Sequence, residues 1–222
     1  TVDIEDPVLI DDGELKITAY SVSHDPVDPA LGYRIDYKGR SISISGDTIY
    51  DKNLVKYSQN VDVLFHESMS VELLNIINNN AKKTDNFVVD IVTVDILDYH
   101  TPILDVVKAA NEANVKHLVF YHHLPAPRNQ LMENIMYRGV DQIRDGWTAS
   151  HDGTMLVLRA NPQARARRRR RKTLPRASKT SPLRARLQAR IKRYIGICIV
   201  SFVYGLCYYV IVIYIYIYAY TY

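Results

Sequence analysis

The sequence predicts a layered α/β domain followed by two segments of different character. Within the first 158 residues, short runs typical of strands are interleaved with stretches of helical periodicity. All 24 acidic residues lie at or before Asp152, whereas 14 of the 28 basic residues lie between Arg165 and Arg193. Beyond that basic stretch the chain is almost entirely apolar. We therefore expect an α/β domain at 1–160, a disordered basic linker at 161–193 and an apolar tail at 194–222.

The predicted strands differ in how deeply they should be buried. Residues 14–22, 33–38 and 41–45 alternate polar and apolar side chains, and Gly39 supplies a hairpin turn between the last two. The apolar runs at 61–65 and 117–121 are typical of strands covered on both faces. A last strand is expected at 154–158, after the turn formed by Asp152 and Gly153.

Four helices are predicted between these strands, at about 70–80, 85–98, 102–114 and 129–138. The third has the clearest amphipathic pattern, because its apolar residues recur along one side: Ile103, Val106, Val107, Ala110 and Ala113. Both cysteines, Cys198 and Cys207, lie in the apolar tail. The domain therefore contains neither a disulfide nor a thiolate metal site.

Polar side chains follow four of the predicted strands, at the point where each strand ends. His24 and Asp47 follow the first and third strands, His66 and Glu67 the fourth, and His122 and His123 the fifth. Such strand ends line the ligand crevice in layered α/β folds. A single histidine there is more often solvated than functional, but four such ends indicate one polar site. Imidazole and carboxylate groups without thiolate suit zinc or manganese in a hydrolytic site.

Four segments within about 14–158 carry a further signal: VSHDPVDPALGYRIDYKGRSISISGDT, VDVLFHES, YHTPILDVVKAANEANVKHLVFYHHLPAP and DGTMLVL. In sequence and in order, they resemble hydrolases of the metallo-β-lactamase fold, in the branch of ribonuclease Z and related sulfatase- or phosphodiesterase-like enzymes. The resemblance implies that residues 1–160 form the C-terminal half of an αββα sandwich. It also implies two Zn²⁺ ions in the complete enzyme, with Mn²⁺ as an alternative.

The resemblance also assigns roles to individual residues. His24 matches a histidine that binds one metal, His122 a histidine that binds the second, and Asp47 the carboxylate that bridges both. His100 matches the histidine that protonates the leaving oxygen, and Glu67 the acid that orients it. A short Asp held after the tight turn at Gly46 suits a bridging role better than a longer, more flexible Glu.

Two departures from the family pattern affect the predicted activity. The motif HxHxDH, which supplies most of the remaining ligands, does not occur in this sequence. We therefore expect the site to be incomplete and the chain to be a piece of something longer, inactive alone. The first 161 residues also carry 14 basic and 24 acidic residues, a formal charge of −10 that disfavours RNA binding. The expected substrate is an ester or phosphodiester, with RNA and a small anionic or neutral ester as alternatives, and a homodimer is a candidate assembly.

The tail allows several interpretations. The basic run is either a nucleic-acid or lipid-binding patch or a solvated linker. Residues 194–222 are long enough for a transmembrane helix, which would place the chain at a membrane, whereas the domain alone would be cytoplasmic. However, Tyr alternates with Ile, Ala or Thr at 213–222, a strand-like pattern that translated noncoding repeats also produce. The function is therefore a metallohydrolase fragment, a membrane-tethered or nucleic-acid-binding protein, or a truncated product without activity.

Overall fold

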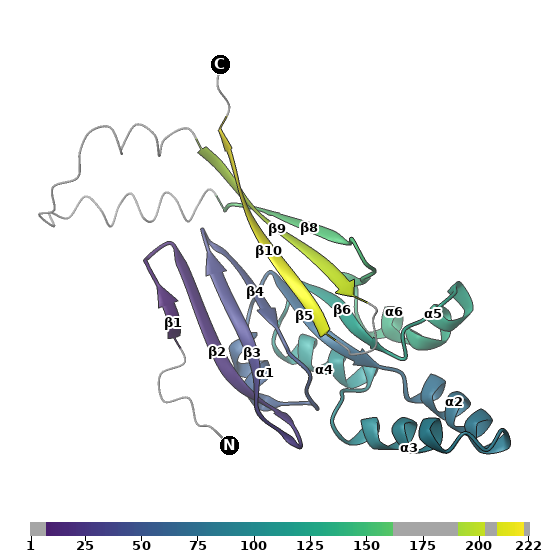
Figure 1. The fold of residues 1–222 in the computed structure, drawn as a ribbon. Coiled ribbons are helices and arrows are strands. Elements are labelled where there is room, and N and C mark those ends of the chain that lie inside the picture. The colour runs from purple at the N-terminus through teal and green to yellow at the C-terminus, as the bar shows by residue number, and fades with distance from the viewer. Residues whose placement is uncertain (1–7, 162–190, 203–207, 220–222) are drawn as a thin grey trace, which may run out of the picture. The chain divides into compact units, whose positions relative to one another are not determined.

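A computed structural model of the chain describes residues 8–161, 191–202 and 208–219. The chain divides into two compact units, one formed by Thr1–Asp36 and Ser41–Ser150 and the other by Tyr37–Arg40 and His151–Tyr222. The first unit combines a large β-sheet with helices (Figure 1). The predicted α/β class is confirmed.

The large sheet has seven strands that neighbour each other in chain order, from β1 to β7. β4, β5, β6 and β7 pair in parallel, and β1 pairs with β2 in antiparallel fashion. The parallel pairing brings the carboxyl ends of β4, β5 and β6 to the same edge of the sheet. The strand bounds are β1 Val8–Asp11, β2 Leu15–His24, β3 Val27–Tyr37, β4 Arg40–Ile44, β5 Val63–Met69, β6 His117–Leu124 and β7 Trp147–Ala149.

The four predicted helices are all present, and two short ones accompany them. The helix predicted at 85–98 consists of α3 and the 3₁₀ turn η1 that continues it. α2 begins directly after β5, is capped by the Ser70 hydroxyl and packs against α3 (Figure 1). The helix bounds are α1 Lys52–Tyr57, α2 Val71–Lys83, α3 Phe87–Asp95, η1 Ile96–Asp98, α4 Ile103–Glu112, α5 Gln130–Met136 and α6 Val140–Ile143.

The main core lies between the sheet and α4. Every apolar position predicted for the buried side of that helix is buried, including Val106 and Val107 at 0% exposure. These side chains share one apolar cluster with Leu64 of β5 and with Leu118 and Phe120 of β6. The helix therefore anchors the two central parallel strands whose ends carry candidate site residues.

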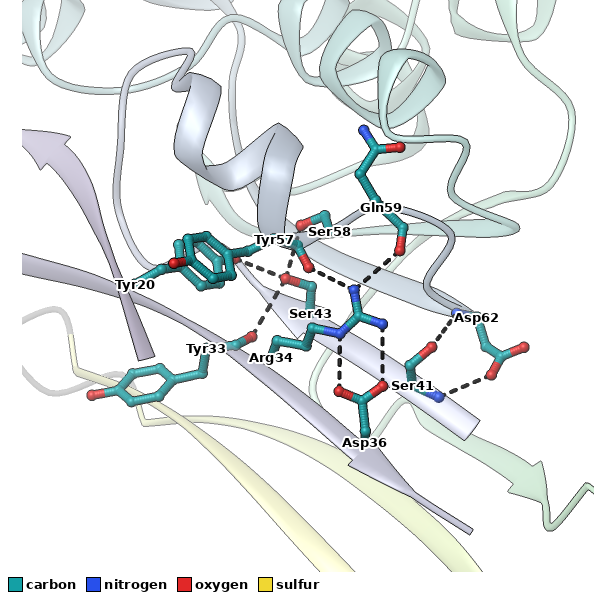
Figure 2. Close-up of polar contacts among 10 residues, drawn as sticks. All are labelled: Tyr20, Tyr33, Arg34, Asp36, Ser41, Ser43, Tyr57, Ser58, Gln59 and Asp62. Carbon is teal, nitrogen blue, oxygen red and sulfur yellow. Dashed lines mark hydrogen bonds and ion pairs between the residues drawn. The ribbon is translucent and has the colours of Figure 1, made fainter. Parts of the chain in front are cut away.

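A buried polar network fastens β2 to β4 and to the end of α1 (Figure 2). The hydroxyl of Tyr20 lies 2.7 Å from that of Ser43, which accepts a hydrogen bond of 2.8 Å from the hydroxyl of Ser58. The ring of Tyr20 stacks on the ring of Tyr57 at 4.9 Å. Because each of these hydroxyls has a partner, the polar groups are buried without the cost of an unmade hydrogen bond.

Arg34 of β3 adds a second tie to the same helix end (Figure 2). Its guanidinium donates to the carbonyl groups of Tyr57 and Gln59 at 2.9 and 3.0 Å, and forms a two-pronged pair with Asp36 at 2.9 and 3.1 Å. A cation at a helix C-terminus satisfies carbonyl groups that have no intrahelical partner. This contact fixes the segment between β4 and β5, which carries Asp47 at its start.

The second unit contains an antiparallel sheet of β8, β9 and β10, with bounds Met155–Arg159, Ile191–Phe202 and Tyr208–Ala219. β8 confirms the strand predicted at 154–158. β10 includes most of the alternating pattern at 213–222, for which a strand-like structure was predicted. Most of the predicted basic linker, residues 162–190, lies outside the described residues.

The described part of the tail, 194–202 and 208–219, contains no transmembrane helix of the kind that its length allowed. Within the described ranges 8–161, 191–202 and 208–219, no helix combines the length and apolar character needed to cross a bilayer. The described residues of the tail are strands instead, as expected for alternating β-branched and aromatic side chains. The transmembrane-helix alternative therefore finds no support.

Candidate metal and catalytic site

Asp47 is placed by a glycine turn directly after β4. Gly46 has a φ of +65°, a conformation that other residues rarely adopt. A Cβ at Gly46 would lie 2.4 Å from the carbonyl oxygen of Leu31, closer than two such atoms can approach. Only glycine fits this turn, and the turn directs the chain so that the next residue, Asp47, lies at the sheet edge shared by β5 and β6.

His122 is placed by a bulge in β6. Glu67 of β5 is paired with Tyr121 and the next residue, Ser68, with His123, so His122 is an extra residue in the ladder. His122 also has a φ of +45°, which is uncommon for a residue with a side chain. The bulge places the imidazole of His122 3.6 Å from the carboxylate of Asp47.

Three of the predicted site residues form a compact cluster. One ligand atom from each of Asp47, His100 and His122 lies within 4.8 Å of the others. His24, at the end of β2, adjoins this cluster, because the centroid of its ring lies 5.1 Å from that of His100. His100 and His122 are buried, and the side chain of Asp47 is 43% exposed.

Glu67, the other predicted site residue, lies next to His100 in the interior of the domain. Its carboxylate is fully buried, lies 3.4 Å from Nδ1 of His100 and accepts a hydrogen bond of 2.7 Å from the backbone N–H of Thr101. Burial raises the pKa of Glu67 well above its usual range, and the Thr101 N–H partly opposes that shift. The hydroxyl of Thr101 donates in turn to the carbonyl of Thr48, next to Asp47.

His100 does not belong to a helix, because α4 begins three residues later at Ile103. His100 lies in the short connection after η1, which is fixed through its neighbour: Thr101 donates its N–H to Glu67, and its carbonyl accepts from the N–H of Met69 at 3.0 Å. Side-chain and backbone contacts to β5 therefore hold His100, rather than a helix.

The histidines of the cluster have the electrostatic character of metal ligands. Burial, together with the charges of the neighbouring histidines, lowers the pKa of His122 to about 3. Burial also lowers the pKa of His100, although the charge of Asp47 opposes that shift. Burial raises the pKa of Asp47, opposed by His100 and His24. A neutral imidazole is the form that binds a metal ion.

One buried atom supports the fit of a cation to these residues. Nδ1 of His24 is buried and has no hydrogen-bond partner among the described residues. An unpaired buried acceptor or donor is costly, and metal coordination is one way to satisfy it. Three imidazoles and a carboxylate form a donor set of the kind that zinc and manganese accept. The residues present therefore fit a divalent metal ion.

The other histidines occupy their own environments. His66 is fully buried, Nδ1 lies 2.8 Å from the carbonyl of Glu67, and burial lowers its pKa to about 4. His117 is half-buried, and its Nε2 lies 2.9 Å from the hydroxyl of Thr148. Tyr99 was not predicted as a site residue. Its ring lies 5.0 Å from the rings of both His24 and His100, and only its place beside His100 signals this in the sequence.

The chain is similar to known ribonuclease Z proteins. It is 31% identical to ribonuclease Z of Mycobacterium tuberculosis (strain ATCC 25177 / H37Ra) over 103 residues, which are 46% of this chain and 34% of that protein. It is 29% identical to ribonuclease Z of Mycobacterium avium (strain 104) over 120 residues, 54% of this chain and 39% of that protein. The predicted resemblance to ribonuclease Z is confirmed. The chain spans less than half the length of these curated relatives.

Comparison of structures gives partial matches. The metallo-beta-lactamase fold protein YhfI from Bacillus subtilis matches with a TM-score of 0.44 and 18% identity, over 63% of this chain and 48% of that one. The short form of human tRNase Z matches with a TM-score of 0.38 and 24% identity, over 53% of this chain and 39% of that one. No model of a protein family matches the chain.

Proposed function

We propose that this chain is part of a ribonuclease Z-like hydrolase that cleaves phosphodiester or related ester bonds with the help of divalent metal ions. The observation that carries the proposal is the convergence of Asp47, His100 and His122 within 4.8 Å at one sheet edge. Those residues lie 53 and 22 positions apart in the chain, so only the fold brings them together. The similarity to ribonuclease Z supports this reading, and residues 1–160 would then form the C-terminal half of the αββα sandwich.

The metal ligands in this proposal are His24 for one ion, His122 for the other and Asp47 for both. The cofactor would be Zn²⁺, with Mn²⁺ as the alternative that the same donor set accepts. Bound metal ions would supply an activated water and would neutralise the negative charge that develops on the ester. The part of Asp47 is geometric: its turn holds the carboxylate 3.6 Å from His122 while leaving it open to solvent on the other side.

His100 would deliver the proton that the leaving oxygen needs, and Glu67 would hold it in place. A leaving alkoxide is a strong base, so protonation matters most for poor leaving groups. Nδ1 of His100 faces Glu67 at 3.4 Å, which leaves the opposite ring nitrogen for the substrate. The alternative is that His100 binds a metal ion instead of donating a proton, because one of its ring nitrogens lies within 4.8 Å of ligand atoms of Asp47 and His122.

Substrates decide between the two assignments of His100. In an enzyme completed with the missing ligands, His100→Ala should slow the hydrolysis of esters with poor leaving groups by ~10²–10⁴-fold. The hydrolysis of activated aryl esters should be unaffected. Turnover of an alkyl and a nitrophenyl phosphodiester by the same variant measures this difference. Equal losses on both substrates would mean that His100 binds metal or supports the fold.

The substrate class follows from charge and from the residues after His122. The formal charge of −10 on the first 161 residues disfavours a polyanion. This chain also reads His123-Leu124-Pro125 where the family that it resembles tends to have a Ser and an Arg-Tyr pair. RNA is the substrate that the names of the relatives indicate, and a small ester is the alternative that the charge favours. Parallel assays on a tRNA precursor and on a small phosphodiester distinguish them.

The proposed site lacks the ligands of HxHxDH, so the chain alone should bind Zn²⁺ weakly and turn over no phosphodiester at a useful rate. Each metal would have one histidine and a shared Asp47, fewer than the three protein ligands of a usual catalytic zinc site. Titration of the full chain with Zn²⁺ tests this. Asp47→Asn should weaken binding further, whereas Asp145→Asn, the same charge change at an exposed position, should not. Tight binding of two zinc ions with phosphodiester turnover would refute the incompleteness of the site.

A further inference from the structure

A second group of polar side chains surrounds His123, the residue that follows His122. Nε2 of His123 lies 2.7 Å from the carbonyl oxygen of Ser150, and Nδ1 lies 2.9 Å from the hydroxyl of Tyr137 and 3.0 Å from that of Ser68. Ser68, Tyr137 and Ser150 are all buried. The proposed reaction gives none of these four residues a role.

The hydrogen bonds define one arrangement of the His123 ring. A carbonyl oxygen only accepts, so Nε2 of His123 carries the hydrogen that it donates to Ser150. Nδ1 is then the acceptor, and the hydroxyl of Tyr137 donates to it. The hydroxyl of Ser68 lies within reach of the same nitrogen and also of the carbonyl of Tyr121, at 3.4 Å. A single neutral tautomer thus satisfies both ring nitrogens.

The partners of His123 come from three different elements. Ser68 belongs to β5, Tyr137 caps the C-terminus of α5, and Ser150 follows β7. Tyr137 is itself held by aromatic packing, with its ring 5.3 Å from that of Phe120 and 5.2 Å from that of Trp147. Hydrogen bonds to β5, to the end of α5 and to the residue after β7 therefore hold the His123 ring in place.

The pinned residue directly follows the bulge that carries His122. With Glu67 paired to Tyr121 and Ser68 to His123, the register of the ladder skips His122, which has a positive φ of 45°. That conformation is unfavourable for a residue with a side chain and persists only where the surroundings enforce it. The bonds of His123 to Ser68 and Tyr137 prevent the strand from slipping back by one residue, which would turn His122 away from Asp47.

We propose that His123 is a positioning residue that locks the β6 bulge and thereby holds His122 as a metal ligand. The inference rests on the proposed function, because it concerns the metal affinity of the same cluster. Outer-shell partners of this kind typically contribute ~10–100-fold to metal affinity. His123→Leu removes all three polar contacts, to Ser68, Tyr137 and Ser150, and should weaken Co²⁺ binding by that factor.

Two further variants separate positioning from simple loss of packing. His123→Asn places an amide oxygen near the position of Nδ1, so it can still accept from Tyr137 and Ser68, and it should recover most of the lost affinity. His117→Leu is the matched control, because His117 is half-buried, makes one side-chain hydrogen bond and begins the same strand, five residues before the bulge at His122. It should bind Co²⁺ as the unmodified chain does.

The experiment is a Co²⁺ titration of the full chain, followed by visible absorption, with folding checked by circular dichroism. The absorptivity per bound ion reports the ligand geometry and does not depend on the folded fraction, so it should change in His123→Leu and not in His117→Leu. If His123→Leu does not fold, Tyr137→Phe removes one donor and keeps the ring, and it should also weaken binding.

The outcomes distinguish this inference from the proposed function. If the unmodified chain binds no Co²⁺, or if Asp47→Asn binds it equally well, the proposed metal site itself fails. If Asp47→Asn loses binding but His123→Leu and Tyr137→Phe retain it, only the role of His123 is overturned. Equal weakening by His123→Leu and His123→Asn would also overturn it, because the retained acceptor would then have no effect.

Discussion

Substituting Gly46 by alanine should destabilise the fold more than a change of one methyl group ordinarily does. The φ of +65° costs about 1–2 kcal/mol for a residue with a Cβ. The new Cβ would also lie 2.4 Å from the carbonyl oxygen of Leu31, a backbone atom that cannot move without shifting β3. Relieving such overlap costs about 1–3 kcal/mol, so we expect a total loss of about 2–5 kcal/mol in the free energy of unfolding.

Gly13 offers a matched control for this prediction. It has a similar φ of +80°, but a Cβ there would meet no atom within 4 Å. Gly13→Ala should therefore show only the conformational cost. Urea unfolding of both variants, followed by circular dichroism, measures the difference. If Gly46→Ala is no more destabilising than Gly13→Ala, the close approach to Leu31 does not restrict the turn, and the argument for how Asp47 is placed fails.

Three other substitutions test the packing that supports the site. Arg34→Met removes charged hydrogen bonds from the end of α1 and should cost about 1.5–3 kcal/mol by urea unfolding, whereas Arg138→Met, which breaks an exposed pair, should cost below about 1 kcal/mol. Burial raises the pKa of Tyr20 from 10.0 to about 12, so the fold favours the neutral phenol; the stability this contributes is present below pH 10 and is lost as the pH rises through 12. In Tyr20→Phe, the free energy of unfolding should fall by about 3 kcal/mol less over this alkaline range than in the unmodified protein. Identical pH profiles of stability for the two proteins would contradict a raised pKa of Tyr20. Leu118→Ala should leave a cavity under α4 and cost about 2–5 kcal/mol, and a loss below 1 kcal/mol would show that the site collapses freely.

The sequence was most informative where many residues repeat one signal. α4 and the buried strands β5 and β6 were predicted because their apolar side chains recur with a clear period or form an unbroken run. Within residues 8–161, the elements that were not predicted are short: β7 has three residues, β1 and α6 have four, and α1 has six. In α1 only Leu54 is buried, so no apolar stripe marks the helix. Contacts with the rest of the fold stabilise such elements, and a local pattern does not contain those contacts.

The candidate site shows the same division. The ends of the strands predicted the convergence of Asp47 with His122, because parallel strands deliver their ends to one edge. The bulge that turns His122 toward Asp47 was not visible in the sequence, because it depends on pairing with β5 rather than on local residue types. The environment of His123 was missed for a similar reason, since its partners Ser68 and Tyr137 are 55 and 14 positions away. The roles assigned by resemblance stay predictions.

The burial of the cluster indicates the direction from which a ligand reaches it. The side chains of Glu67, His122 and His100 are 0%, 4% and 6% exposed, whereas that of Asp47 is 43% exposed. A carboxylate that both adjoins buried imidazoles and faces solvent is the first strong charge that an entering cation meets. The buried residues behind it exclude water, which strengthens their attraction for the cation because the local dielectric is low. Asp47 should therefore govern the rate at which the metal ion associates, whereas His122 and Glu67 should govern the rate at which it dissociates. We expect Asp47→Asn to lower the association rate of Co²⁺ more than His122→Ala does, as measured by stopped-flow absorption. Equal effects of both variants on that rate would show that entry does not pass Asp47.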